Sequence, residues 1–191
     1  MGNARADEGF RRLYHFGSSG ESIGFYWRDM APPDKRKVIA ALLQHLSELA
    51  VQATKAANAT RDGATHPEAK PENEKDTRSL EQSYLARGQA MRVTELNEQI
   101  QSLRFMPVRS FGPGDAITVG ALVTLQAEKD VRCLFLAPCG GGTELSIDGV
   151  SIFVVNPQSP LGAGVRGRAV GDEVELVARG ARHEYVIAAV S

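Results

Sequence analysis

Four carboxylates lie close together in the middle of the chain, and their spacing could hold a hard metal cation. Glu68, Glu72, Glu74 and Asp76 share one short polar segment. Magnesium prefers oxygen ligands, keeps several waters and usually takes only one or two carboxylates from a protein. Acidic side chains alone do not specify such a site, and an exposed cluster would hold the ion only weakly until a partner's ligands completed its coordination shell. The alternative is that these carboxylates only favour the N-terminus of a following helix, without any metal.

The residues on both sides of this acidic segment have a helical pattern. Residues 34–104 are rich in good helix formers, and their apolar positions recur at steps of three and four. The repeating positions are Val38, Leu42, Leu46, Leu49, Ala53, Ala56, Val93, Leu96, Ile100 and Leu103. Each stripe is narrow and needs the other arm to cover it, so the pattern predicts an antiparallel helical hairpin with arms on the order of 40 Å long. We also expect Tyr84, Leu85 and Met91 to pack inside this hairpin.

Glycine and proline mark the reversal between the two arms. Residues 60–63 end in Gly63, and residues 66–71 contain Pro67 and Pro71. Proline removes a backbone donor and disfavours helix in the residue before it. The chain is therefore predicted to turn within residues 60–71, which places the acidic segment at the tip of the hairpin. A reversal within one chain favours a monomer over a coiled-coil dimer.

The last part of the chain changes to a strand pattern. Residues 117–191 are rich in Val, Ile and Gly, which is typical of short strands joined by tight turns. The predicted strands cover residues 117–126, 131–138, 150–156, 173–178 and 184–190. The resulting division is an irregular N-terminal extension (1–33), a helical hairpin (34–106), a linker (107–116) and a β domain (117–191). This organisation predicts an α+β protein.

The N-terminal extension has no clear period. Residues 1–29 hold several aromatic side chains and arginines without a helical or strand repeat. One interpretation is that translation starts at Met30, since Met30 to Asp34 resembles an ordinary start followed by a helix N-terminus. Intact-mass measurement of the native protein would test this expectation.

Composition excludes several classes of protein. A formal net charge of -1 over 191 residues argues against coating of DNA or RNA, which needs a clear excess of cations. Cys133 and Cys139 are the only cysteines and no histidine stands beside them at ligand spacing, so neither zinc nor a disulfide framework is indicated. No apolar run is long enough for a membrane span. We expect a cytoplasmic protein without a membrane partner.

The most specific local signal lies in the β region. Residues 156–167 include Ser159, which can cap a short helix beginning with Pro160. Residues 170–176 follow with a Val-Gly-Asp turn into a strand. This run resembles the C-terminal domain of the GreA/GreB family of bacterial transcription elongation factors, and residues 119–125 resemble the strand that opens that domain. The resemblance implies a coiled-coil hairpin followed by a small FKBP-like antiparallel β domain.

The resemblance also implies a function. Members of this family bind RNA polymerase through its secondary channel and stimulate the polymerase's own cleavage of backtracked RNA, so the factor itself is not an enzyme. Two tip carboxylates are thought to share a magnesium ion with the polymerase active centre, with no cofactor bound stably and nucleic acid contacted only within the elongation complex. Glu72-Asn73 matches the family's Glu-Asn pair, but Ala69 stands at the usual Asp position. A second carboxylate would come from Glu68, Glu74 or Asp76.

Two further expectations follow from this resemblance. Polymerase contacts on the β domain are assigned to the capped turn and the arginines after it, namely Ser159, Pro160, Leu161, Arg166 and Arg168. Ala69 leaves open a variant function, a regulator that occupies the same channel without stimulating cleavage. The FKBP-like fold also suggests a peptidyl-prolyl isomerase, but the β region has few aromatic side chains to line a pocket.

Overall fold

The computed structural model describes residues 33–65, 77–112, 114–127, 130–178 and 181–191. Residues 33–191 form one compact unit. Its described residues form two long helices, a short helix and six strands, so the α+β prediction is confirmed. Among the described residues, none of the helices combines the length and apolar character that crossing a membrane requires.

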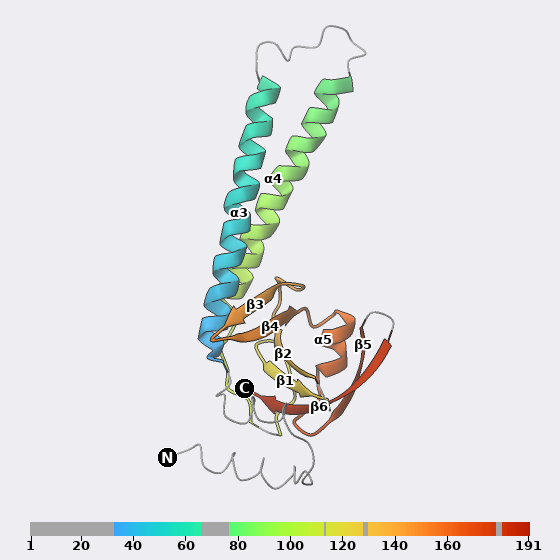
Figure 1. The fold of residues 1–191 in the computed structure, drawn as a ribbon. Helices are drawn as coiled ribbons and strands as arrows, with labels where there is room; N and C mark the ends of the chain where they lie inside the picture. Colours follow the sequence, from blue (N-terminus) through green and yellow to red (C-terminus); the bar gives the residue numbers. More distant parts are fainter. Residues whose placement is uncertain (1–32, 66–76, 113, 128–129, 179–180) are drawn as a thin grey trace. The chain divides into compact units, whose positions relative to one another are not determined.

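The two long helices pack against each other along the hairpin (Figure 1). Helix α3 runs from Lys35 to Thr65 and helix α4 from Thr77 to Arg104. We call residues 35–50 with 96–104 the base half, and residues 51–61 with 83–95 the outer half. Side chains of the base half form a buried seam that consists of Val38, Leu42, Leu46, Ala50, Leu96, Ile100 and Leu103.

The outer half differs from the prediction. None of its described side chains is fully buried, and its seam is made of half-buried small or polar residues. These are Ala53, Ala57, Thr60, Ala86, Gln89 and Val93. The expectation that Ala56 faces the seam was wrong. After Leu46 the seam continues through Ala50, Ala53 and Ala57, which leaves Ala56 on the exposed side of the helix. Tyr84, Leu85 and Met91 were also misassigned: each is more than half exposed.

The first part of the predicted turn is helical. Residues 60–63 continue α3, which ends at Thr65. Glycine within a helix costs only about 1 kcal/mol relative to alanine, so Gly63 alone does not stop a long helix. The other part of the predicted turn, residues 66–71, lies outside the described residues.

The β domain is a single mixed sheet, and the prediction of a purely antiparallel domain was wrong. Its strand order is β3-β4-β2-β1-β6-β5. The strands are β1 (Leu122–Gln126), β2 (Val131–Leu136), β3 (Glu144–Ile147), β4 (Val150–Val155), β5 (Glu173–Ala178) and β6 (Ala181–Val190). Strands β2 and β4 pair in parallel, from Cys133 with Ile152 to Leu136 with Val155, whereas the other pairs are antiparallel. Strand β3 was missed by the sequence prediction.

The sheet has apolar residues on both faces. One face, with the short helix α5 (Pro160–Val165), forms a core around Leu125, Leu134, Ile187 and Tyr185. Alternation along the strands directs Cys133, Phe135, Ile152 and Val154 to the other face, where they are also buried. Burial on both faces explains the continuous apolar run from Cys133 to Leu136 in the central strand β2.

Several contacts join the base half to the β domain. The Lys35 Nζ donates a hydrogen bond of 2.7 Å to the carbonyl of Arg109 and lies 4.8 Å from the centre of the Phe111 ring. The Lys37 ammonium lies 2.8 Å from an Asp148 carboxylate oxygen. Together these contacts fix the start of α3 against the segment that leads into the sheet and against the β3–β4 turn.

Candidate functional site

The predicted magnesium ligands lie outside the described residues. Glu68, Glu72, Glu74 and Asp76, together with Ala69, belong to residues 66–76, between α3 and α4. Within the described ranges no group of three or more His, Cys, Asp and Glu side chains is arranged to hold a metal ion. The tip magnesium site therefore stays a prediction from the sequence.

The capped turn of the β domain has the local geometry that its sequence predicts. The Ser159 hydroxyl accepts a hydrogen bond of 3.1 Å from the Gly162 backbone N–H and donates one of 2.7 Å to the Asn156 carbonyl. Pro160 occupies the first turn of α5, where a missing N–H costs nothing. Ser159 therefore has a structural role at this position, because its hydroxyl bridges the end of β4 to the helix.

Gly162 is required by the close approach of two backbone segments. A Cβ atom at this position would lie 2.1 Å from the Asn156 carbonyl oxygen and 3.0 Å from the Pro157 Cα. Both neighbours are backbone atoms, so neither can rotate away. The glycine lets α5 sit directly against the chain that leaves β4.

The Val-Gly-Asp turn is held by its aspartate. The Asp172 carboxylate accepts a hydrogen bond of 2.9 Å from the Ala169 N–H, and its backbone carbonyl accepts one of 2.9 Å from the Ile187 N–H. Gly171 has a φ of +94°, a left-handed conformation that favours glycine. The turn thus connects the loop after α5 to β6. Its glycine and aspartate are needed for the turn's conformation and hydrogen bonds.

The exposed part of this region is cationic. Pro160, Arg166 and Arg168 are exposed, whereas Leu161 is half-buried and packs against the core. Backbone bonds between Ile117 and the residues 167–168 hold the arginine loop in place. Among the described residues neither guanidinium forms an ion pair. Of the five predicted contact residues, Pro160, Arg166 and Arg168 can reach a partner, whereas the Ser159 and Leu161 side chains face inward.

A charged cluster that the sequence did not indicate surrounds Tyr185. The Tyr185 hydroxyl donates a hydrogen bond of 2.5 Å to Asp130, and the Arg132 Nε donates one of 2.7 Å to the same carboxylate oxygen. The bond from Tyr185 lowers the pKa of Asp130, and burial raises the pKa of Tyr185. Asp130 and Arg132 lie at the start of β2, whereas Tyr185 lies in β6, and the pairing of β1 with both strands brings them together. The cluster links the start of β2 to β6.

The glycine-rich loop after Cys139 is explained by packing. A Cβ on Gly140 would lie 2.9 Å from a Leu42 methyl carbon, and one on Gly141 would lie 3.2 Å from the Asn156 nitrogen. The Cys139 thiol donates to the Gln99 carbonyl at 3.2 Å, and burial raises the pKa of this thiol. A raised pKa disfavours the reactive thiolate. Neither a reactive thiol nor a phosphate loop is indicated here.

Comparison with known proteins gives weak likenesses. No protein-family model and no characterised protein sequence matches this chain. Among solved structures, GreA factor homolog 1 (Gfh1) of Thermus thermophilus is 18% identical, with 81% of this chain and 93% of that chain covered and a TM-score of 0.34. Thermus aquaticus Gfh1 is 16% identical over 79% and 94% of the two chains, with a TM-score of 0.33. The GreA/GreB elongation factor from Nitrosomonas europaea is 19% identical over 57% and 89%, with a TM-score of 0.32. At these TM-scores the likenesses carry no functional argument, and the proposal below rests on the residues of this chain.

Proposed function

We propose that this protein is an accessory factor of bacterial RNA polymerase that reaches into the secondary channel and regulates transcription elongation. The observation that carries the proposal is the combination of one long two-helix hairpin with a β domain built around the Ser159–Gly162 turn. These residues resemble the GreA/GreB family, and the geometry of the turn explains why their types are needed together. RNA polymerase is accordingly the proposed partner.

The dimensions of the hairpin support this role. Helix α3 has 31 residues, which corresponds to roughly 45 Å of helix. Contacts of the base half anchor the hairpin to the rest of the unit, through Lys35 to the linker and through Lys37 to the β3–β4 turn. A long rod held at one end can enter a channel while the β domain remains outside.

We further propose that the hairpin stimulates cleavage of backtracked RNA. Glu72 would be the principal carboxylate, helped by Glu68, Glu74 or Asp76, and it would share a magnesium ion with the polymerase. In a two-metal hydrolysis such an ion activates the attacking water. The factor alone would hold the ion weakly, since an exposed tip offers too few ligands.

A cleavage assay on stalled, backtracked polymerase tests both parts of the proposal. We expect Glu72→Ala to reduce RNA cleavage by at least about tenfold, as is typical when the support of a metal ion is lost, while co-purification with polymerase is retained. Glu98→Ala removes an exposed carboxylate from α4 and serves as the matched control. Absence of polymerase from the co-purified material would refute the proposed partner.

The second candidate function is a regulator that occupies the channel without stimulating cleavage. Ala69 at the usual Asp position favours it. In this case wild-type protein binds polymerase and alters elongation, but backtracked RNA stays intact. Cleavage restored by the wild-type protein would exclude this version.

The isomerase alternative is not favoured by the β domain. Of its three aromatic side chains, Phe135 and Tyr185 are buried in the sheet, and Phe153 is 42% exposed. Buried rings within a packed core cannot line an open pocket for proline. We therefore do not assign this activity to the chain.

A further inference from the structure

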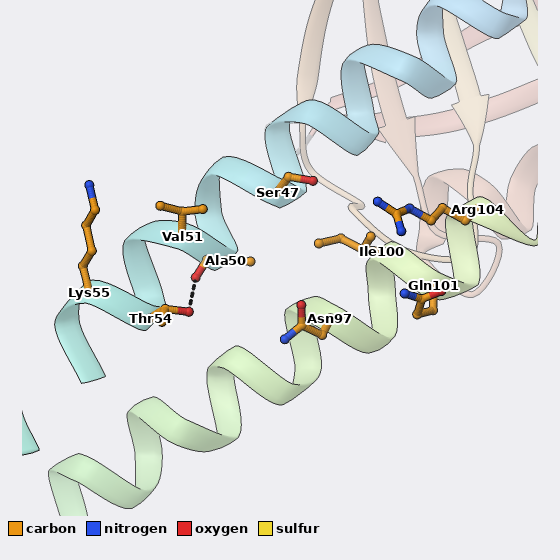
Figure 2. A pocket seen from close by; sticks show the side chains of 9 residues that line it. All are labelled: Ser47, Ala50, Val51, Thr54, Lys55, Asn97, Ile100, Gln101 and Arg104. Carbon is orange, nitrogen blue, oxygen red and sulfur yellow. Dashed lines mark hydrogen bonds between the residues drawn. The ribbon is translucent and has the colours of Figure 1, made fainter. Parts of the chain in front are cut away.

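A shallow groove runs between the two helices of the hairpin. It has a volume of about 420 Å³ and lies where the base half meets the outer half. The lining residues are Ser47, Ala50, Val51, Thr54, Lys55, Asn97, Ile100, Gln101 and Arg104 (Figure 2). Both walls belong to the hairpin itself.

The floor of the groove is apolar. Ala50 and Ile100 lie below it at 8% and 7% exposure, and Val51 adds a side chain that is 54% exposed. Figure 2 shows Ile100 turned toward α3. An exposed valine beside a small apolar floor can accommodate one small aliphatic side chain of a partner.

The polar groups above the floor divide into two kinds. The Ser47 and Thr54 hydroxyls donate to the carbonyls of their own helix, at 2.7 and 2.8 Å. The exposed Asn97 and Gln101 amides have no hydrogen-bond partner among the described residues. Each amide carries donors and an acceptor, which is what the N–H and C=O groups of an extended peptide need.

The charges of the groove are all positive. Arg104 on α4 points toward the groove, and the Lys55 stem lines it while its ammonium extends outward from α3 (Figure 2). No carboxylate is among the lining residues; the nearby Glu48 accepts a hydrogen bond of 3.0 Å from Gln44. Positions 47 to 55 span about 12 Å of helix, so the two cations mark opposite ends of a short site.

From these features we infer that the groove binds an extended acidic segment of a partner protein, with a small aliphatic side chain between two carboxylates. Extended chain advances about 3.3 Å per residue and its side chains alternate between two faces, so carboxylates four residues apart, with the aliphatic side chain midway between them, match the length of the site and point to the same side. Single-stranded nucleic acid fits less well, because the lining offers no aromatic side chain for base stacking and only two cations. The inference does not depend on the polymerase proposal.

The test uses the full chain and a fluorescein-labelled peptide with the core Glu-Ser-Val-Ser-Glu between Gly-Ser linkers, in which both carboxylates and the valine share one face of an extended chain. We expect saturable binding in fluorescence anisotropy, and no binding of a Gln-Ser-Val-Ser-Gln peptide. Lys55→Gln with Arg104→Gln should weaken binding about fivefold or more, since two exposed ion pairs are lost. Arg36→Gln with Arg87→Gln removes the same charge from exposed helix positions outside the groove and should change the affinity less than about twofold.

Side-chain amide signals in nuclear magnetic resonance spectra give a second readout. Titration with the acidic peptide should shift the Asn97 and Gln101 signals in the wild-type protein, and circular dichroism should show unchanged helix content in both double variants. The inference is overturned if the acidic peptide does not bind at millimolar concentration, or if both double variants weaken it equally. A uridine hexamer that binds more tightly than the peptide, and depends on Lys55 and Arg104, would also overturn it in favour of nucleic acid.

Discussion

The two halves of the hairpin share one architecture but are stabilised in different ways. In the base half, leucine, isoleucine and valine side chains form a buried seam and the helix ends are tied to the β domain. In the outer half, alanine, threonine, glutamine and a single valine line the seam, and none of the described side chains is buried. Helix stability in proteins comes mostly from packing of an apolar face. The hairpin therefore combines a firmly anchored base with an outer part that depends on helix propensity.

Substitution of a buried seam residue should have the largest effect. Leu96 is 1% exposed in the base half, and Leu96→Ala should lower the free energy of unfolding by about 2 to 5 kcal/mol. Leu85→Ala, at a position that is 55% exposed in the outer half, should change it by less than about 0.5 kcal/mol. Urea denaturation of both variants measures the difference. Equal losses would mean that the outer half is packed as tightly as the base.

Hydrogen exchange should show the same difference in stability between the base half and the outer half of the wild-type protein. Amides of residues 51–61 should open with a free energy at least about 2 kcal/mol lower than amides of residues 38–50, because local opening of the outer half exposes little apolar surface. Mass spectrometry of exchanged peptides can compare the two segments within one helix. Uniform protection along α3 would contradict the comparison.

Replacing the polar pair of the outer seam should reduce the difference in opening free energy between the two halves of the hairpin. The Thr60 hydroxyl lies 2.8 Å from the Gln89 carbonyl oxygen across the two helices. Replacing both partners with apolar residues can be neutral or stabilising, so Thr60→Val with Gln89→Leu should raise the opening free energy of residues 51–61 by about 1 kcal/mol. Exchange in residues 38–50 should stay unchanged and serves as the internal control. Faster exchange of the outer half would show that the polar pair is needed.

The smallest effect is expected from the pH dependence at the base of α3. Burial, and then the nearby Arg109 charge, lower the pKa of Lys35 from its ordinary 10.5. Between the lowered value and 10.5 the unfolded chain binds more protons than the folded chain, so stability rises with pH in this window. The unfolding free energy of wild type relative to Lys35→Met should therefore increase as pH approaches 10.5.

Lys37 provides a control of opposite sign. Its hydrogen bond to Asp148 raises the pKa of this lysine above 10.5. The stabilisation is fully present below 10.5 and is lost as pH rises through the higher folded value. Wild type relative to Lys37→Met should thus lose stability at high pH. The same trend for both variants would refute the assigned causes.

The sequence predicted those features that depend on neighbouring residues. The repeat from Val38 to Leu46 identified the base seam, and the Ser159-Pro160 pair identified the capped turn. Residues close in sequence determine both features, so a local pattern is enough. The turn at residues 60–63 was misplaced, because glycine weakens a helix without ending it.

Features that join distant segments were not predictable in this way. Strand β3 is only four residues long with one buried side chain, Leu145, so its alternation is too short to identify a strand. The parallel pairing of β2 with β4 depends on the path of the chain through β3, which no single strand encodes. The Tyr185 cluster and the groove between α3 and α4 likewise arise only when separate elements meet. For the site, the sequence named the exposed Arg166 and Arg168, but the inward roles of Ser159 and Leu161 needed the fold.

The position of Gly162 has a consequence for how this chain can vary. A side chain at this residue would overlap the Asn156 carbonyl oxygen, whereas Pro160 and Ala163 in the same turn are exposed. In a saturation library of residues 159–163, positions 160 and 163 should tolerate many amino acids while position 162 retains glycine. The glycine of the motif would then be retained because folding requires it, and the exposed residues around it could change during evolution while the fold is kept.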